Sequence, residues 1–272
     1  VTTARACRTI NLLSGGRYTF GLGSMPRNWN EDHHGIPGDK PIARMKEFVK
    51  LIRVLWQAGP EEPVNFRGNF YNVVDYRVAE RPPHPHLPIY IGASRPNMFR
   101  AAGEWADGIL LNWNYTLPWL KQVAYKAIAE GAERAGRTWQ DLDIVALRWT
   151  FIADDQEQEA EAKNAVRKIL GTYFMGVDYH KELLIDHGFS EEVERSGEAA
   201  SRGDFAGAAR AITDEMVDTF SIIGPEDKCL ERVAEFKDLV GTFSLYSLNP
   251  NGTRADGIKS MRRLIKTFGS NL

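Results

Sequence analysis

The segment from Pro88 to Asn112 constrains the fold most, because it has the pattern of a complete strand, helix and strand. The apolar run Ile89 to Ile91 ends at Gly92, and apolar residues then recur at helical spacing up to Ala106. A second apolar run, Ile109 to Leu111, closes the segment. This pattern predicts one βαβ unit.

Three small residues, Gly92, Ala93 and Ser94, lie between the first of these strands and the helix. They let backbone N–H groups and the Ser94 hydroxyl approach an anion at the positive end of a helix that starts near Pro96. A phosphate group fits such a turn. An ordinary tight turn of an α/β protein has the same composition, so these residues alone leave both interpretations open.

The alternation of strand and helix continues along the chain. The candidate strands lie near Tyr18, Ile89, Ile109, Ile144 and Thr242. Repeated βα units favour a parallel sheet, and at 272 residues a closed (β/α)₈ TIM barrel is the commonest way to bury one. A barrel needs eight strands, and the chain enters a helical pattern directly from Val1, without an initial Met. We expect a single, partial TIM-barrel domain over residues 1–272 that lacks about three N-terminal βα units, unless something outside this sequence closes the sheet.

Amphipathic helices are predicted with defined buried faces. The clearest runs from Lys40 to Gln57, and its charged face has Arg44, Lys46, Glu47, Lys50 and Arg53 opposite an apolar stripe of Met45, Phe48, Val49, Ile52, Leu55 and Trp56. Residues Ile222 to Glu226 are expected to open another helix, whose apolar face includes Leu230, Val233, Phe236 and Leu239. The expected buried residues are Ala6, Ile10 and Leu13 in a helix from Thr2 to Leu13, and Ile258, Met261, Leu264 and Ile265 in the last helix. A small hairpin is predicted between Val64 and Val73. Residues 154–219 are polar and interrupted by glycines, with too little apolar content for an independent core, so we expect a helical insertion there.

A long loop is predicted after the first strand, because the residues from Ser24 to Asp39 contain two Pro and two Gly and no periodicity. Gly21 and Gly23 form G-L-G, but the third Gly of a dinucleotide fingerprint is absent and no helix is expected to begin there, so we reject a Rossmann site. Such glycines let a bulky ligand ring lie close to the backbone.

In a barrel, residues at the C-terminal ends of the strands line the active site. The residues at these positions are Gly23, Ser24, Gly92, Ala93, Ser94, Asn112, Trp113, Ile152, Ala153, Leu248 and Asn249. Asp107 and Gly108 precede their strand at the opposite rim, so we expect a structural turn there.

Charge and cysteine usage narrow the class of partner. The net charge is -2 and the pI is about 6.4, with both signs interspersed, which provides no basic footprint for nucleic acid or an anionic membrane. A small molecule is the expected partner. Cys7 and Cys229 are far apart and form no C-x-x-C pattern, which suits the cytoplasm. No apolar run is long enough to span a membrane, and the first residues lack the apolar region of a secretion signal.

Metal and hydrolytic sites are not expected. Glu31, Asp32, His33 and His34 resemble a ligand cluster to which His84 and His86 could add, but adjacent residues on a loop point apart. A solvated or cofactor-lining loop is the favoured interpretation. No G-x-S-x-G elbow is present.

Four stretches together resemble a known family. They are L-L-S-G-G-R-Y-T-F-G-L-G at 12–23, N-E-D-H-H-G-I-P at 30–37 with the helix that follows, I-Y-I-G-A-S-R-P-N-M-F-R at 89–100, and A-D-G-I-L-L-N at 106–112. The chain resembles the bacterial luciferase-like superfamily, in particular its coenzyme F420-dependent, methylenetetrahydromethanopterin reductase-like branch. The family normally begins with three further βα units.

The resemblance implies a cofactor site. The cofactor-binding residues that we expect are Gly21, Gly23, Ser24, Asn30, Gly92, Ala93, Ser94 and Asn112. In the family, the turn matching Gly92 to Ser94 binds the cofactor phosphate, and the loop after Gly23 approaches the ring and its tail. Ser94-Arg95-Pro96 departs from the family's common G-x-G-P form. The family's acid or base often comes from its first two strands, so no catalytic residue is assigned.

The resemblance also implies a function. We expect hydride transfer to or from the deazaflavin of coenzyme F420, with a small organic substrate held under the 154–219 insertion. The alternatives are an FMNH₂-dependent monooxygenase, with FMN as its cofactor, and a non-catalytic flavin-binding subunit. Trp29, Trp113 and Trp149 are candidates for the pocket wall, although core packing is favoured for Trp149. A homodimer is expected.

Overall fold

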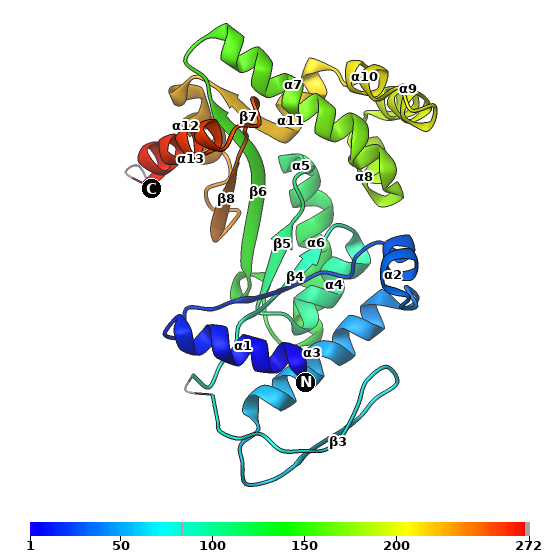
Figure 1. Ribbon diagram of the computed structural model, residues 1–272, viewed down its shortest axis with the longest axis vertical. Coiled ribbons are helices and arrows are strands. Elements are labelled where there is room, and N and C mark those ends of the chain that lie inside the picture. The colour runs from blue at the N-terminus through cyan, green and yellow to red at the C-terminus, as the bar shows by residue number, and fades with distance from the viewer. Residues whose placement is uncertain (83, 270–272) are drawn as a thin grey trace. The chain divides into compact units, whose positions relative to one another are not determined.

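The computed structural model describes residues 1–82 and 84–269, which form two compact units (Figure 1). Unit 1 contains Val1–Leu110 and Ala124–Asp143, and unit 2 contains Leu111–Val123 and Ile144–Leu272. Each unit is described by itself. No helix among the described residues has both the length and the apolar character that a membrane span requires.

Parallel strands form the centre of unit 1. β1 (Phe20–Leu22) pairs in parallel with β4 (Ile89–Ala93), with Phe20 opposite Ile89 and Leu22 opposite Ile91, and β5 (Gly108–Leu111) follows in the sheet. α4 (Pro96–Trp105) connects β4 to β5 and has Pro at its start. The βαβ unit predicted from residues 88–112 is therefore confirmed.

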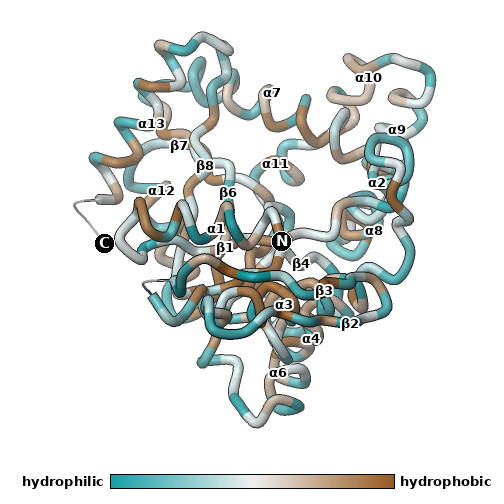
Figure 2. The backbone as a smooth tube through the Cα atoms, turned by 60° about the horizontal axis from the view of Figure 1, so that its bottom comes forward, coloured by the Kyte–Doolittle hydropathy of each residue, from teal (hydrophilic) through white to brown (hydrophobic). Residues whose placement is uncertain are grey.

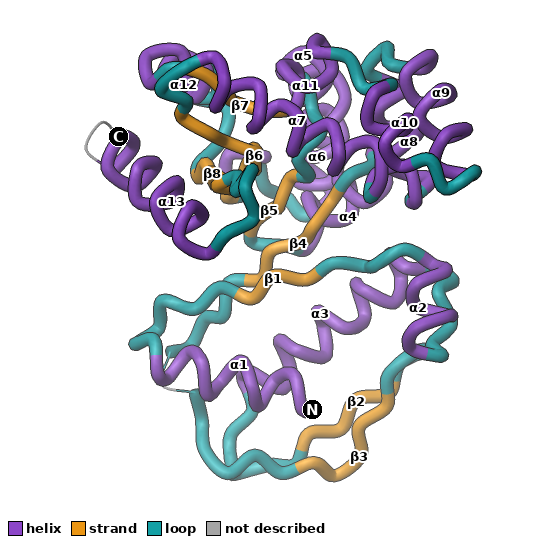
Figure 3. Tube along the Cα trace, turned by 45° about the horizontal axis from the view of Figure 1, so that its top comes forward, coloured by secondary structure: helices purple, strands orange, loops and turns teal. Residues whose placement is uncertain are grey.

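Two helices and a hairpin complete one side of unit 1. They are α1 (Thr2–Leu13), α3 (Pro41–Gln57), and the antiparallel strands β2 (Val64–Arg67) and β3 (Asn72–Tyr76), which Figure 3 shows side by side. The predicted helix and hairpin are both confirmed. The stripe of α3 is buried at Met45, Val49, Ile52, Leu55 and Trp56, and Figure 2 shows brown, hydrophobic residues along this helix.

α6 (Tyr125–Arg134) packs against α4 through glycine. A Cβ atom on Gly131 would overlap the carbonyl oxygen of Arg100, and one on Gly103 would overlap that of Ile128. Only residues without a side chain allow this approach. Unit 1 also contains the 3₁₀ segment η2 (Trp139–Asp141).

The predicted buried face of α1 is wrong. The helix buries Ala4, Cys7 and Asn11, while Ile10 is exposed and Leu13 is 81% exposed. Arg8 explains this orientation, because its guanidinium donates to the carbonyl oxygens of Leu55, Trp56 and Ala58 at the carboxyl end of α3 (2.5, 3.2 and 3.1 Å). With Arg8 held at the end of α3, the residues of α1 that become buried are Ala4, Cys7 and Asn11.

The predicted long loop is also wrong in part, because α2 (Arg27–His34) lies within it. A helix therefore does begin shortly after G-L-G. No residue of α2 is buried, so the sequence contains no apolar stripe that could reveal the helix. Its other signals are Pro26 before it, the Arg27–Glu31 ion pair (2.8 Å), and Gly35 with φ +62° after it.

Unit 2 is built on β6 (Asp143–Ile152), whose first residue lies in unit 1. β6 pairs in parallel with β7 (Ser221–Gly224), from Trp149 opposite Ser221, and with β8 (Thr242–Ser247), from Val145 opposite Thr242. β7 was not predicted, because it is short and Pro225 follows it directly, so these residues were interpreted as the start of a helix. The helix expected there, α12 (Glu226–Ala234), begins after it.

Residues 154–219 are helical, as predicted. The helices of unit 2 before β7 are α5 (Leu117–Trp119), the π-helical turn η1 (Leu120–Ala124), whose last residue belongs to unit 1, α7 (Gln156–Thr172), η3 (Phe174–Gly176), α8 (Asp178–Asp186), α9 (Ser190–Ser201), α10 (Phe205–Arg210) and α11 (Asp214–Phe220). Their apolar content is larger than the sequence pattern indicated. Most of a large buried cluster comes from them, and they share it with Trp149, Ile223 and Leu248. Their assignment as an insertion in one domain stays a prediction.

The last helix, α13 (Arg254–Gly269), buries a different face from the one predicted. Leu264 is buried together with Thr267 and Phe268, whereas Ile258 and Met261 are exposed and Ile265 is 65% exposed. The pattern located the helix correctly, but hydrophobicity alone chose the wrong side of it.

Candidate functional site

The predicted cofactor residues fall in both units. Asn112 belongs to unit 2, and the others, Gly21, Gly23, Ser24, Asn30, Gly92, Ala93 and Ser94, belong to unit 1. Each group has its own geometry.

The sequence predicted a turn at Gly92, Ala93 and Ser94, but Gly92 and Ala93 are the last two residues of β4 and only Ser94 follows the strand. We refer to residues 92–94 as the Gly92 turn, and it lies directly beside the end of β1. A Cβ atom on Gly92 would lie 3.7 Å from the carbonyl oxygen of Leu22 and 3.9 Å from the Cα of Gly23. Ala93 is buried and Ser94 is half-buried, and α4 begins at Pro96, shortly beyond the end of β4. The turn therefore combines close backbone approach with a helix N-terminus, the arrangement that favours an anion.

A cavity of about 250 Å³ opens at the end of β1. Gly23, Ser24 and Asn30 line it, and the Asn30 amide donates to the carbonyl oxygen of Ser24 (3.0 Å). Gly21 does not line the cavity; it pairs with Tyr90 inside the sheet. The structure thus brings three predicted residues together at one cavity and the Gly92 turn next to it.

Further lining residues of this cavity were missed by the sequence interpretation. They are Asp39, Arg44, Phe48 and Tyr71, among others. Phe48 was counted with the core stripe of α3 and Arg44 with its charged face. Tyr71 reaches the cavity only because the hairpin turns back onto α3, and no local signal in the sequence reports that contact.

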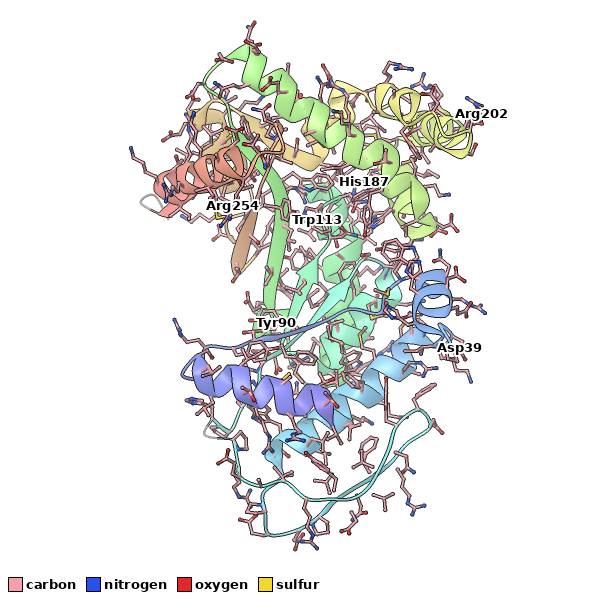
Figure 4. All side chains as sticks on the ribbon, viewed as in Figure 1. Asp39, Tyr90, Trp113, His187, Arg202 and Arg254 are labelled. Carbon is pink, nitrogen blue, oxygen red and sulfur yellow. The ribbon has the colours of Figure 1, made fainter. Side chains whose placement is uncertain are left out.

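In unit 2, Asn112 begins a loop whose polar atoms are held from several sides. Its side-chain oxygen accepts from the Trp113 N–H (2.7 Å), and its amide nitrogen lies 3.4 Å from Nδ1 of His180 on α8. The Tyr115 hydroxyl accepts from the Asn112 N–H. Figure 4 labels Trp113 of this loop and His187 beside it. We refer to residues 112–116 as the β5 loop.

Arg148 is the cation beneath the β5 loop. It is only 2% exposed, and its guanidinium donates to the carbonyl oxygens of Trp113 (2.6 Å) and Tyr115. Its charge also lies over the Phe236 ring, 5.1 Å from the centroid. Burial lowers the pKa of Arg148 to about 10, so the side chain remains charged at neutral pH.

Two histidines hold the other side of the β5 loop. Nε2 of His187 accepts from the Thr116 N–H (2.9 Å), which requires a neutral imidazole. His180 is 1% exposed, with the Phe174 and Tyr179 rings each 4.1 Å away. Burial lowers the pKa of His180 and that of His187 to about 4. Both are neutral near pH 7.

The candidate tryptophans have different environments. Trp149 lies in the core of unit 2, which confirms the favoured interpretation, and Trp113 stacks on it at 5.8 Å with 7° between the planes. Trp29 lies on α2, 6.0 Å from the His33 ring. It is not among the residues that line the cavity.

Asp107 has the structural role expected of it. Its carboxylate accepts from the Ile89 N–H (2.8 Å) and pairs with Arg53 (2.9 Å). Over residues 1–82 and 84–269, no three His, Cys, Asp or Glu side chains converge as metal ligands would. Glu31 is instead bonded to Arg27 and to the Gly38 N–H, and His33 and His34 are exposed.

The chain was compared with known proteins. A family model described as luciferase-like monooxygenase matches residues 1–242. The 5,10-methylenetetrahydromethanopterin reductase of Archaeoglobus fulgidus is 34% identical over 238 residues, covering 86% of this chain and 68% of that protein. The same-named reductase of Methanolobus tindarius is 32% identical over 272 residues, covering 99% and 77%.

A solved structure agrees with these sequence matches. The coenzyme F420-dependent tetrahydromethanopterin reductase from Methanopyrus kandleri superposes with a TM-score of 0.76 at 26% identity, covering 96% of this chain and 76% of that chain. Parallel strands connected by helices are thus shared with a solved relative. The chain belongs to the luciferase-like monooxygenase family of oxidoreductases, as the sequence resemblance indicated.

Proposed function

We propose that this chain binds coenzyme F420 and that the cofactor exchanges hydride with a small organic substrate. The two reductases that are more than 30% identical to it support the class of reaction. The reductase from Methanopyrus kandleri depends on coenzyme F420, which supports the choice of cofactor. When bound, the deazaflavin supplies the hydride chemistry, and the protein supplies binding, orientation and shielding.

The observation that carries the proposal is the contact between the carboxyl ends of β1 and β4 in unit 1. Gly92 lies against Leu22 and Gly23, and a Cβ atom on Gly23 would meet no atom of the described residues within 4 Å. The backbone of these two segments is thus in contact, and the space beside Gly23 is open to a ligand. Residues Gly92 to Ser94 would hold the cofactor phosphate at the start of α4, and Gly23 and Ser24 would receive its ring or tail.

In unit 2, Asn112 of the β5 loop is a separate candidate for contact with a ligand. Asn112 is held by the Trp113 N–H and faces neutral His180, so its carboxamide has one defined orientation. Such a group orients a ligand without having to reorganise when the ligand arrives. We propose no general acid or base.

A titration with both cofactors tests the proposed function. The purified protein is titrated with F420 and with FMN, each oxidised and reduced, and binding is followed by the fluorescence of the ligand. We expect saturable binding of F420 and none of FMN. Tight FMN binding without F420 binding would overturn the proposal.

A pair of glycine variants tests the place of binding. Gly92→Val should abolish the binding of F420, because its side chain fills the space beside Leu22 and Gly23. The matched control is Gly197→Val on α9, where a new Cβ atom meets no described atom within 4 Å, and it should leave binding unchanged. Equal F420 affinity of both variants would exclude residues Gly92 to Ser94 as the phosphate site.

The second candidate is an FMNH₂-dependent monooxygenase, which the description of the family model favours. It predicts the reverse outcome of the same titration, together with oxygen consumption on adding reduced FMN.

We also propose the finer features that the resemblance implied: a (β/α)₈ barrel built in part from these parallel strands, and a homodimer. Location in the reducing cytoplasm is supported by Cys7 and Cys229, which are buried free thiols. Sedimentation equilibrium measures the proposed dimer directly.

A further inference from the structure

The cavity at the end of β1 contains an arginine that neither the sequence nor the proposed function uses. Arg44, in the first turns of α3, lines the cavity with a side chain that is 25% exposed. Its one ion pair among the described residues is with Asp39, at 3.3 Å. Its Nε atom is buried without an acceptor in the described part of the chain.

The hairpin of β2 and β3 helps to hold the Arg44 guanidinium in place. The Glu47 carboxylate accepts from the backbone N–H groups of Asn69, Phe70 and Tyr71 (2.8, 2.8 and 2.7 Å) and so fastens the turn between β2 and β3 to α3. As a result, the Phe70 ring lies under the Arg44 guanidinium, 4.5 Å from its central carbon. The Arg44 cation is therefore pre-organised by parts of the fold distant in sequence.

The carboxylate on the opposite side is held much more loosely. Asp39 is half exposed, and its contact with Arg44 is long, at 3.3 Å. Figure 4 labels it where the segment after α2 leads into α3. Asp39 lies in the segment from Met25 to Lys40, which contains α2, and no residue of α2 is buried. Met25 and Lys40 have left-handed backbone angles (φ 52° and 49°), which are unusual for residues other than glycine.

The cavity offers both kinds of contact that a carboxylate-bearing chain needs. Arg44 supplies a planar cation suited to a carboxylate, and Met45, Phe48 and Tyr71 supply an apolar wall. The cavity begins at Gly23, whose Cα lies beside the Gly92 turn in the same unit. A ligand whose phosphate occupies that turn can therefore reach Arg44 without leaving unit 1.

We propose that this cavity is a carboxylate subsite: Arg44 binds a carboxylate of the cofactor's tail, and Asp39 occupies that place on Arg44 when the ligand is absent. The identity of the ligand rests on the proposed function. The bound carboxylate displaces the Asp39 side chain, so Asp39 weakens binding and Arg44 strengthens it.

Two probes and four variants test the subsite. The probes are F420 and the corresponding deazaflavin alcohol without phosphate or tail, and binding of each is measured by fluorescence. Arg44→Met should weaken F420 binding about tenfold and leave the tail-less probe unchanged, and Arg44→Lys should have a smaller effect. Asp39→Asn should strengthen F420 binding about threefold. Lys50→Met, which removes an exposed cation of the same helix, should change neither.

The outcomes separate failure of the subsite from failure of the proposed function. If wild-type protein binds both probes but Arg44→Met weakens neither, or weakens both equally, the subsite is wrong and the proposed function stands. If wild-type protein binds neither probe, the proposed function and the subsite that rests on it both fall. Circular dichroism of Arg44→Met, with Arg44→Lys beside it, shows whether a loss of affinity reflects a loss of fold.

Discussion

The cavity at the end of β1 and the β5 loop are two polar regions that are each in contact with an arginine, Arg44 and Arg148. The two arginines differ in their burial and in their hydrogen-bond partners. Beneath the β5 loop, Arg148 of β6 is almost fully buried and donates to backbone carbonyl oxygens of the loop, and no carboxylate of the described residues forms an ion pair with it. At the cavity, Arg44 is partly exposed and faces a half-exposed carboxylate, Asp39, at 3.3 Å. Buried donors with fixed acceptors rigidify a structure, whereas a weak exposed pair can be exchanged for a ligand.

The residues around the β5 loop and around the cavity also differ in burial. His180 and His187 pack among aromatic rings and hold the β5 loop through neutral nitrogen atoms. The cavity is bordered by α2, which buries no side chain. Regions with few buried contacts open at low cost. We infer that the β5 loop is a rigid part of unit 2 and that the cavity is a part of unit 1 that adapts to a ligand.

Arg148→Met should produce the largest effect. It leaves the carbonyl oxygens of Trp113 and Tyr115 without their donors, and we expect a loss of roughly 3–5 kcal/mol in the free energy of unfolding, measured by urea denaturation. Arg195→Met on the exposed face of α9 is the control and should change stability by less than about 0.5 kcal/mol. A loss below about 1 kcal/mol at Arg148 would contradict the idea of a rigid, buried clamp.

The pH dependence of stability should come next in size. The pKa of His180 and that of His187 are lowered by burial from 6.5 to about 4. The unfolded chain therefore takes up protons at higher pH than the folded chain. Their contribution to the free energy of unfolding is complete above about pH 6.5, is lost as the pH falls towards 4, and changes no further below that.

Urea denaturation at pH 7 and pH 5 measures this loss, which we expect to be roughly 1–2 kcal/mol for each histidine. Replacing both residues, as His180→Phe with His187→Phe, should flatten the profile, and His33→Phe on exposed α2 should not. An unchanged slope in the double variant would show that other groups cause the acid sensitivity.

Glu47→Gln should have an intermediate effect on the cavity. A neutral amide accepts more weakly than a carboxylate from the N–H groups of Asn69, Phe70 and Tyr71, so we expect a lower free energy of unfolding, with a smaller loss than at Arg148. Because Phe70 then no longer fixes Arg44, F420 binding should weaken while binding of the tail-less probe stays the same. Equal affinity of wild type and variant for F420 would separate the hairpin from the subsite.

Arg27→Ala should have the smallest effect. The Arg27–Glu31 pair is exposed on α2, and exposed ion pairs contribute little to the free energy of unfolding. A thermal shift comparable to that of Glu47→Gln would mean that α2 is a rigid part of the fold, and the contrast between the two regions would be lost.

The parts of the fold that the sequence predicted are those with strong buried patterns. Ile89 and Ile91 are fully buried in β4, and the stripe of α3 is continuous, so periodicity located both elements. α2 was missed because none of its residues is buried. The faces of α1 and α13 were misjudged because packing partners, such as the carbonyl groups that hold Arg8, decide which side turns inward.

The candidate site was predicted in part for the same reason. Gly23, Ser24 and Gly92 lie at the ends of strands, and strand ends can be located from the sequence. Arg44 and Arg148 could not be recognised, because each depends on residues distant in the chain: Phe70 for one, and the carbonyl oxygens of Trp113 and Tyr115 for the other.

The most direct test of the account is to map the backbone amide shifts of the isotopically labelled protein as F420 is added. We predict that the largest shifts in unit 1 occur at residues 92–98, from the end of β4 to the start of α4, and at residues 22–30. Saturable binding with shifts concentrated elsewhere in the chain, and none at these residues, would contradict it.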